Sequence, residues 1–318
     1  MRVLALAWAL LAAFAAASQA QARDLLIRDA RIFDGTGAPA TTGNVLVSGD
    51  RIVAVGPGIR GHRGSRTVRA RGLTLIPGLH DLHTHLRSPA FDAPDDLPKA
   101  YAAYLVNGIT SVNDFSVSGE MLAPIREMTA SGAVAAPHLQ LAVRLGVPGG
   151  HGTEFGWGRA FTLEAVTPRA AHLAMARALP YRPDVIKVFA DGWRYGRVPS
   201  LNSMNEPTLA AIVEDAHAAG IPVITHTVSI EGARIAVAAG VDALGHSIGD
   251  ALVDDALIAL LKAKGTAYIG TLATYEPQAD REFLPAEWRR LRTVERAREE
   301  ARRSAARDEP SDREAARW

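Results

Sequence analysis

The sequence predicts an α/β fold, a (β/α)8 barrel of the TIM type that stops before its eighth strand and follows a small antiparallel β-unit. Three observations support this prediction. The chain has 318 residues, which suits one large α/β-barrel domain or two smaller domains. From residue 73 onward, short apolar segments alternate with amphipathic ones, and regular βα alternation implies a parallel sheet. Three amphipathic segments end at a glycine just before the next apolar segment, at Gly220, Gly240 and Gly265.

The composition excludes several classes of function. The chain has 35 Lys and Arg against 34 Asp and Glu, so bulk charge does not suit it to bind nucleic acid. It has no cysteine, which excludes a disulfide scaffold, a cysteine-ligated zinc site and a cysteine nucleophile. With 48% hydrophobic and 22% charged residues the balance is that of an ordinary globular protein. A small-molecule partner is compatible with this composition.

The first 22 residues predict a secretory signal peptide. Arg2 precedes an Ala-rich apolar run over 3–17, and small residues at 20–22 fit an A-x-A cleavage pattern. The run is short for a membrane span, which needs about 20 apolar residues, and no later segment is apolar enough to cross. The alternative is an amphipathic or buried first helix. We expect a mature chain that begins near Gln21 or Arg23 and works in the periplasm or outside the cell.

The next part of the chain, 23–72, predicts the small antiparallel β-unit. Its short alternating runs are separated by turn residues such as Asp34-Gly35-Thr36-Gly37 and Ser48-Gly49-Asp50. The predicted strands cover 25–33, 44–47, 51–55 and 67–69.

The barrel is predicted over 73–280. No Gly-x-Gly-x-x-Gly turn and no Walker-type loop occurs there, so a nucleotide site is not indicated. The predicted strands cover 73–79, 108–112, 138–145, 184–190, 221–227, 243–246 and 268–272, and the predicted helices 95–107, 121–131, 166–178, 206–219, 230–239 and 251–264.

The last segment, 281–318, differs in character. It holds 11 Arg and 9 Asp or Glu, and apolar positions become sparse after Val294. We expect one or two exposed helices of mixed charge, with a frayed tail as the alternative.

The strongest local signal is the segment Pro77–His85. Two histidines two residues apart on a strand point to the same face. Because the carboxyl ends of barrel strands line the active-site mouth, His83 and His85 can converge there on one metal ion as neutral imidazoles. By the same parity Asp81 lies inward and His80 points outward. Alone, such a pair could equally be structural.

Three further residues stand at strand positions of the same kind. His226 and His246 end two apolar strands, and Lys187 lies in the middle of another. A lysine there is costly unless it is paired or neutral, and a neutral amine can react with CO2 to give a carbamate that bridges two metal ions. Satisfied core histidines and a lysine reaching outward are the alternatives for each residue alone; the combined set favours a metal site.

This set of residues resembles the metal-dependent amidohydrolase superfamily, and within it the imidazolonepropionase-like group that includes Xaa-Pro dipeptidases. The resemblance runs from about Asp24 to Leu272, with an extension to Trp318 as the alternative, and rests on P-G-x-x-D-x-H-x-H with the later lysine and histidine strands. It implies that the β-unit is the N-terminal half of a small composite β-sandwich. It also implies that His83 and His85 bind one divalent metal, that His226 and His246 bind the other, and that carboxylated Lys187 bridges them. Zinc is the default metal, with Mn, Fe or Co as alternatives, and a homo-oligomer is compatible with the group.

The resemblance also implies a reaction, hydrolysis of a C–N bond in an amide, dipeptide or cyclic amide by a metal-activated hydroxide. In the superfamily an aspartate at the end of strand eight moves the proton. No such residue is found: Asp308 and Asp312 lack a strand-like context, while Asp250, Asp254 and Asp255 start a helix. We therefore expect the strand and its aspartate to lie beyond Trp318 and the activity to be impaired. The alternative is a non-catalytic metal-binding fragment.

Two loops are candidates for substrate binding. His151, in Gly149-Gly150-His151-Gly152 after strand three, is expected to bind a substrate carbonyl, with a structural loop histidine as the alternative. The aromatic and arginine residues of 191–197 suit a ring and a carboxylate, with a solvated loop as the default. A lyase or isomerase on the same fold is less favoured, because the histidine and lysine set is suited to activating water.

Overall fold

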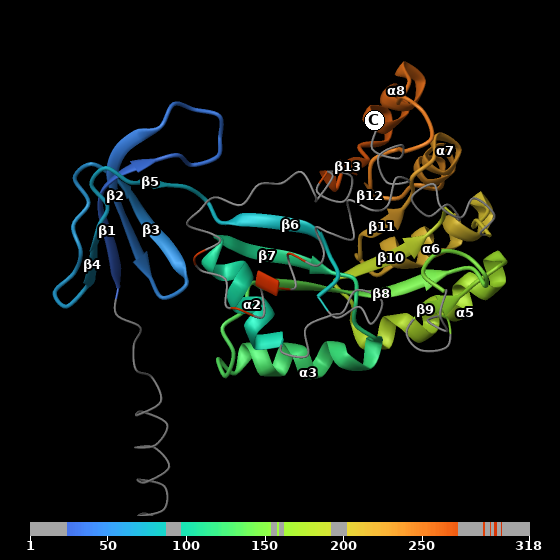
Figure 1. Ribbon diagram of the computed structural model, residues 1–318, viewed down its shortest axis with the longest axis horizontal. Coiled ribbons are helices and arrows are strands. Elements are labelled where there is room, and N and C mark those ends of the chain that lie inside the picture. The colour runs from blue at the N-terminus through green and yellow to red at the C-terminus, as the bar shows by residue number, and fades with distance from the viewer. Residues whose placement is uncertain are drawn as a thin grey trace, which may run out of the picture. The chain divides into compact units, whose positions relative to one another are not determined.

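The computed structural model describes residues 24–86, 97–153, 162–191 and 202–272, together with single positions at 158, 289, 293, 296, 297 and 300. The chain divides into two compact units, Met1–Gly78 and Leu79–Trp318 (Figure 1). The predicted signal peptide, the loop over 192–197 and most of the charged segment over 281–318 lie outside the described residues. Within the described ranges no helix is long and apolar enough to cross a membrane.

The first unit is one five-stranded sheet with the order β3-β2-β1-β4, in which β5 also pairs with β1. The first three strands are antiparallel as predicted, but β4 and β5 run parallel to β1, which corrects the prediction of a purely antiparallel unit. A bulge in β1 places Asp29 at φ 59, where the side chain of Asn44 accepts its backbone N–H. The strands are β1 (Leu25–Ile32), β2 (Thr41–Ser48), β3 (Arg51–Gly56), β4 (Arg66–Arg69) and β5 (Thr74–Leu75).

The second unit contains the predicted barrel. Seven parallel strands follow the order β13-β12-β11-β10-β8-β7-β6, and a short extra strand, β9, pairs with β8. The fold class is thus confirmed as an α/β barrel of parallel strands, and an eighth strand on the main path is not among the described residues. The strands are β6 (Leu79–Thr84), β7 (Ile109–Asp114), β8 (His138–Gly146), β9 (Thr162–Glu164), β10 (Val185–Phe189), β11 (Val223–His226), β12 (Ala243–Gly245) and β13 (Ala267–Ile269).

One barrel strand begins later than predicted. The apolar run over 73–79 is not a buried strand: Leu73 is 61% exposed and Leu79 is 49% exposed. Part of that run forms β5 of the first unit, and the barrel strand β6 starts at Leu79. The unit boundary consequently falls after Gly78, whereas the sequence placed it after residue 72.

The helices connect successive strands, and local side chains define their ends. Thr167, Asn205, Ser229 and Asp254 each accept a backbone N–H of the first turn. Two of the predicted glycine stops are left-handed C-caps: Gly240 ends α7 with φ 94°, and Gly265 ends α8 with φ 70°. The helices are α2 (Leu97–Val106), α3 (Gly119–Ala130), α5 (Pro168–Ala178), α6 (Glu206–Ala218), α7 (Ile230–Ala239) and α8 (Asp255–Lys264), with a 3-10 turn, η3, at Leu179–Tyr181.

The main hydrophobic core lies between the helices and the outward face of the barrel sheet. In β10, Ile186 and Val188 belong to this core and are fully buried. Burial of each such aliphatic side chain stabilises the fold by about 1.5–3 kcal/mol. Because side chains alternate along a strand, Lys187 between them faces the opposite way, into the barrel.

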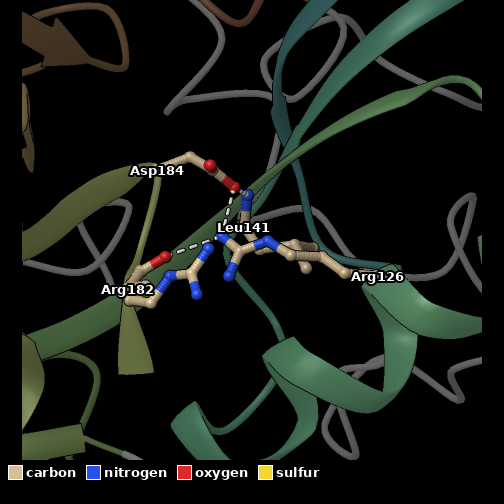
Figure 2. A network of polar contacts seen from close by, with 4 residues as sticks. All are labelled: Arg126, Leu141, Arg182 and Asp184. Carbon is tan, nitrogen blue, oxygen red and sulfur yellow. Dashed lines mark hydrogen bonds and ion pairs between the residues drawn. The ribbon is translucent and has the colours of Figure 1, made fainter. Parts of the chain in front are cut away.

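Carboxylates hold the amino ends of the barrel strands. Asp184 accepts hydrogen bonds from the backbone N–H of Leu141 at 2.9 Å and from Arg126 of α3 at 2.7 Å (Figure 2). Asp242 accepts the N–H of Val223 at 2.7 Å and lies 2.9 Å from a ring nitrogen of His217 in α6. These carboxylates therefore have structural partners, and the candidate site lies at the other end of the strands.

Candidate metal centre

The five predicted metal-binding residues come together at the carboxyl ends of the barrel strands. The ring centroids of His83 and His246 are 4.4 Å apart, those of His226 and His246 are 4.7 Å apart, and those of His83 and His85 are 5.4 Å apart. The Lys187 Nζ lies 3.3 Å from Nε2 of His83. Residues separated by up to 163 positions in the sequence thus form one cluster.

The barrel interior around Lys187 is aromatic and cationic. Its Nζ lies 4.6 Å from the centroid of the Phe115 ring and 5.5 Å from that of Phe189. Arg144 of β8 pairs in register with Lys187 and is 1% exposed. It donates to the backbone carbonyl oxygen of Gly152 at 3.0 Å. Sequence reasoning missed Arg144, although an arginine inside an apolar strand is the same signal that drew attention to Lys187.

Burial holds the ligand groups in their neutral forms. Desolvation lowers the pKa of Lys187 well below its ordinary value, and the charge of Arg144 adds to the effect. Desolvation, with smaller contributions from nearby cations, lowers the pKa of His85 to about 3 and those of His83 and His246 well below the ordinary range. Metal binding needs neutral imidazoles, and reaction with CO2 needs a neutral amine, so the site favours both at neutral pH.

Two of the histidines are held by close backbone packing. Nδ1 of His246 lies 2.8 Å from Oγ1 of Thr271, a contact that orients the ring. Both residues have positive φ, 111 for His246 and 41 for Thr271, a conformation that is costly for side chains of this kind. A Cβ on Gly245 would lie 3.0 Å from the ring of His83, so a larger residue where β12 passes that ring would have to push it aside by a few tenths of an ångström.

His151 lies beside the cluster. Its ring centroid is 4.2 Å from that of His226, and its ring meets Phe189 edge-on at 5.1 Å. The glycine loop that carries it is held by a bridge between Gly150 and Asn202. A pocket of about 210 Å³ adjoins this loop and is lined by Val147, Pro148, Val166, Asn202, Ser203, Met204, Asn205 and Thr208.

The donor set fits divalent metal ions when Lys187 contributes an oxygen. Nδ1 of His83 is buried with no hydrogen-bond partner among the described residues. Within these ranges no group of three or more His, Asp or Glu side chains already has a metal-binding arrangement. The predicted centre supplies only two imidazoles to each ion, so the third protein ligand would be the carbamate of Lys187. Neutral imidazole with an anionic oxygen suits zinc and related ions.

Four of the described carboxylates near these strand ends have hydrogen-bond partners within the fold. Asp250 accepts the backbone N–H of Ile230, and Asp254 caps α8. Burial raises the pKa of Asp81 and that of Asp114, but both carboxylates accept backbone N–H groups next to the cluster. Asp308 and Asp312, which lack a strand-like context in the sequence, lie outside the described residues.

Comparison with known proteins identifies the family of the chain. The model of the amidohydrolase family matches residues 74–312. A dihydroorotase from Geobacter metallireducens is 33% identical over 89 residues, 28% of this chain and 21% of that protein. An N-acyl-D-aspartate deacylase from Alcaligenes xylosoxydans xylosoxydans is 42% identical over 94 residues, 28% of this chain and 17% of that protein. The matched stretch thus spans about a fifth of these relatives.

The fold has solved counterparts. A Xaa-Pro dipeptidase with bound methionine superposes with a TM-score of 0.68 at 21% identity, covering 92% of this chain and 76% of that one. An ochratoxinase from A. niger gives a TM-score of 0.68 at 20% identity, covering 89% of this chain and 71% of that one. These likenesses concern the fold.

Proposed function

Because the chain belongs to the amidohydrolase family, we propose that it is a metal-dependent hydrolase of C–N bonds in an amide, dipeptide or cyclic amide. The observation that supports this proposal is the cluster of four imidazoles and one buried amine at the carboxyl ends of four barrel strands. The names of its relatives, which include a dihydroorotase and an N-acyl-D-aspartate deacylase, agree with chemistry at C–N bonds.

We assign each residue of the cluster a role. His83 and His85 would hold one divalent ion, His226 and His246 the other, and carboxylated Lys187 would bridge them; zinc is the default metal. When bound, such ions supply Lewis acidity and a water molecule of lowered pKa.

Lys187 becomes a metal-binding oxygen donor through one reaction. The neutral amine attacks the carbon of CO2, a C–N bond forms, one C=O π bond becomes the carboxylate, and the amine proton leaves to solvent. The reaction needs a neutral amine, and the lowered pKa of the buried Lys187 side chain favours that form. The neighbouring charge of Arg144 would stabilise the anionic carbamate.

His151 would bind the carbonyl oxygen of the substrate. Its ring lies against His226, within the same group of aromatic rings, so a carbonyl held by His151 would lie next to the metal ligands. Burial of the site, where His151 is 9% exposed, strengthens such a polar contact by excluding water.

The test is hydrolysis by the zinc-loaded full chain. Candidate substrates are a Xaa-Pro dipeptide, dihydroorotate and an N-acyl-D-aspartate, with release of product followed by chromatography. We expect slow, impaired turnover of at least one C–N substrate, because no aspartate among the described residues is assigned the proton transfer. This turnover should be lost in His226→Asn and kept in His172→Asn, a change at an exposed histidine bonded to Asp215. Metal binding without turnover of any C–N substrate would contradict the proposal and favour a non-catalytic metal-binding protein.

We also propose that residues 1–22 direct export to the periplasm or beyond the cell. The charged start, apolar run and small residues at 20–22 support this. Amino-terminal sequencing of the protein recovered from the periplasm should give a start near Gln21 or Arg23. An intact Met1 in protein confined to the cytoplasm would contradict it.

A further inference from the structure

Asp191 makes an unusual set of contacts directly after β10. A single carboxylate oxygen, Oδ2, accepts four hydrogen bonds: from Thr227 Oγ1 at 3.1 Å, Val228 N at 3.1 Å, Ser229 N at 3.0 Å and Ser229 Oγ at 2.6 Å. The donors are three consecutive residues that begin immediately after His226. Asp191 is 4% exposed, so its carboxylate is an interior group. The sequence alone predicts a solvated loop as the default for this residue.

The surrounding backbone is shaped for this carboxylate. Ser229 is the N-cap of α7, and its hydroxyl oxygen also accepts the N–H of Gly232 at 3.0 Å. A helix N-terminus favours a negative charge, because its first N–H groups lack partners within the helix. A Cβ on Gly232 would lie 2.7 Å from Asp191 Oδ2 and 2.8 Å from Thr227 Oγ1, so a side chain there would displace the carboxylate.

The contacts join two of the four strands that carry the proposed ligands. β10 carries Lys187, β11 ends at His226, and the register pairs Phe189 with His226. Asp191 follows Phe189 by two residues, so it binds the loop after β11 at the point where the backbone leaves His226. Hydrogen bonds to a carboxylate are about twice as strong as neutral ones, so the four contacts of Asp191 hold the loop in place.

We propose that Asp191 is a positioning residue for the metal centre, which fixes His226 relative to Lys187 by holding Thr227–Ser229. The inference rests on the proposed function, since it concerns the ion that His226 binds. Loss of residues that orient a metal ligand typically weakens metal binding about 10–100-fold. Asp191 itself would touch neither metal nor substrate.

The experiment compares Asp191→Asn with Asp242→Asn in the full chain. Asp242 is the matched control, because it holds the opposite end of the same strand through the N–H of Val223. Thermal unfolding and cobalt(II) binding, by chelator competition and visible absorption, are measured for both. We expect both variants to unfold at a lower temperature than the wild type. Only Asp191→Asn should bind one of its two cobalt ions about 10–100-fold more weakly, and only its visible absorption spectrum should change.

A milder variant covers the case in which Asp191→Asn does not fold. Thr227→Val removes one of the four donors to Asp191 and nearly keeps the side-chain volume. We expect it to lower the affinity for one cobalt ion by a few fold, less than Asp191→Asn does. Wild-type affinity in Asp191→Asn, or in Thr227→Val where the first does not fold, would overturn the inference.

A measurement without metal separates this inference from the proposed function. In metal-free protein labelled with ¹⁵N-histidine, Asp191→Asn should shift or broaden the His226 imidazole signal, and Asp242→Asn should leave it unchanged. If wild type binds no cobalt, the proposed function fails, and this signal decides the role of Asp191. An unchanged His226 signal in Asp191→Asn would overturn the inference that Asp191 positions His226.

Discussion

The buried histidines predict a loss of stability in mild acid, and His85 allows its size to be worked out. Burial, with the nearby charges of Lys187, Arg144 and His151, lowers the pKa of His85 to about 3 in the folded protein, against about 6.5 in the unfolded chain. Below pH 6.5 the unfolded chain therefore binds a proton that the folded protein does not, so stability falls as pH falls from 6.5 towards 3.

The magnitude follows from proton linkage. Between pH 7.5 and pH 4.5 the pKa difference of His85 alone removes about 2.7 kcal/mol of unfolding free energy. His83 and His246 have pKa values lowered in the same direction, so they steepen the dependence of the wild type. Carboxylates titrate in the same range, but they contribute equally to a variant that lacks only His85.

The assay is urea unfolding of the metal-free protein at the two pH values. We expect the wild type to lose about 2.7 kcal/mol more than His85→Asn between pH 7.5 and 4.5. His172→Asn, at an exposed position, serves as the control and should follow the wild type. Equal losses in the wild type and His85→Asn would refute the conclusion that the folded protein holds this imidazole in its neutral form.

Three further predictions concern the ligands and the strand ends. Lys187→Ala should lower the bound metal from two ions to one or none, measured by elemental analysis; unchanged two-ion stoichiometry would exclude the bridging role. Gly245→Ala should push the ring of His83 by a few tenths of an ångström and weaken zinc affinity at least several fold in a chelator titration, and wild-type affinity would show that the ring has room. Asp184→Asn should cost about 1–3 kcal/mol in urea unfolding without changing the metal content, because it weakens bonds to Leu141 and Arg126 at the other end of the strands; a loss of metal would contradict the separation of the two ends.

The barrel was predictable because burial sets the spacing of apolar residues. Runs such as 184–190 and 221–227 are apolar on both faces, as strands covered on both sides must be, and glycines mark the helix ends. The same signal failed at 73–79, where the run is apolar but Leu73 is 61% exposed. Hydrophobicity indicates that a segment tends to be buried, and it does not show which unit the segment joins.

The candidate site was predictable where one strand position determines the direction of a side chain. His83, His85, Lys187, His226 and His246 stand at or near strand ends, so the parallel sheet alone brings them together. The contacts of Arg144 and Asp191 could not be predicted in this way, although an arginine inside an apolar strand could have been singled out as Lys187 was. The position of Arg144 beside Lys187 follows from the register of β8 against β10, and the contacts of Asp191 follow from the path of the loop after β11. Both depend on tertiary contacts, which the sequence pattern does not indicate.

Anomalous X-ray scattering at the zinc edge, from crystals of the full chain grown with zinc and bicarbonate, tests the central claim most directly. The account predicts two peaks about 3.5–4 Å apart, one bound by His83 and His85 and the other by His226 and His246, with density for a carboxylated Lys187 between them. A map with no peak inside this cluster, or with zinc bound only elsewhere on the chain, would contradict it.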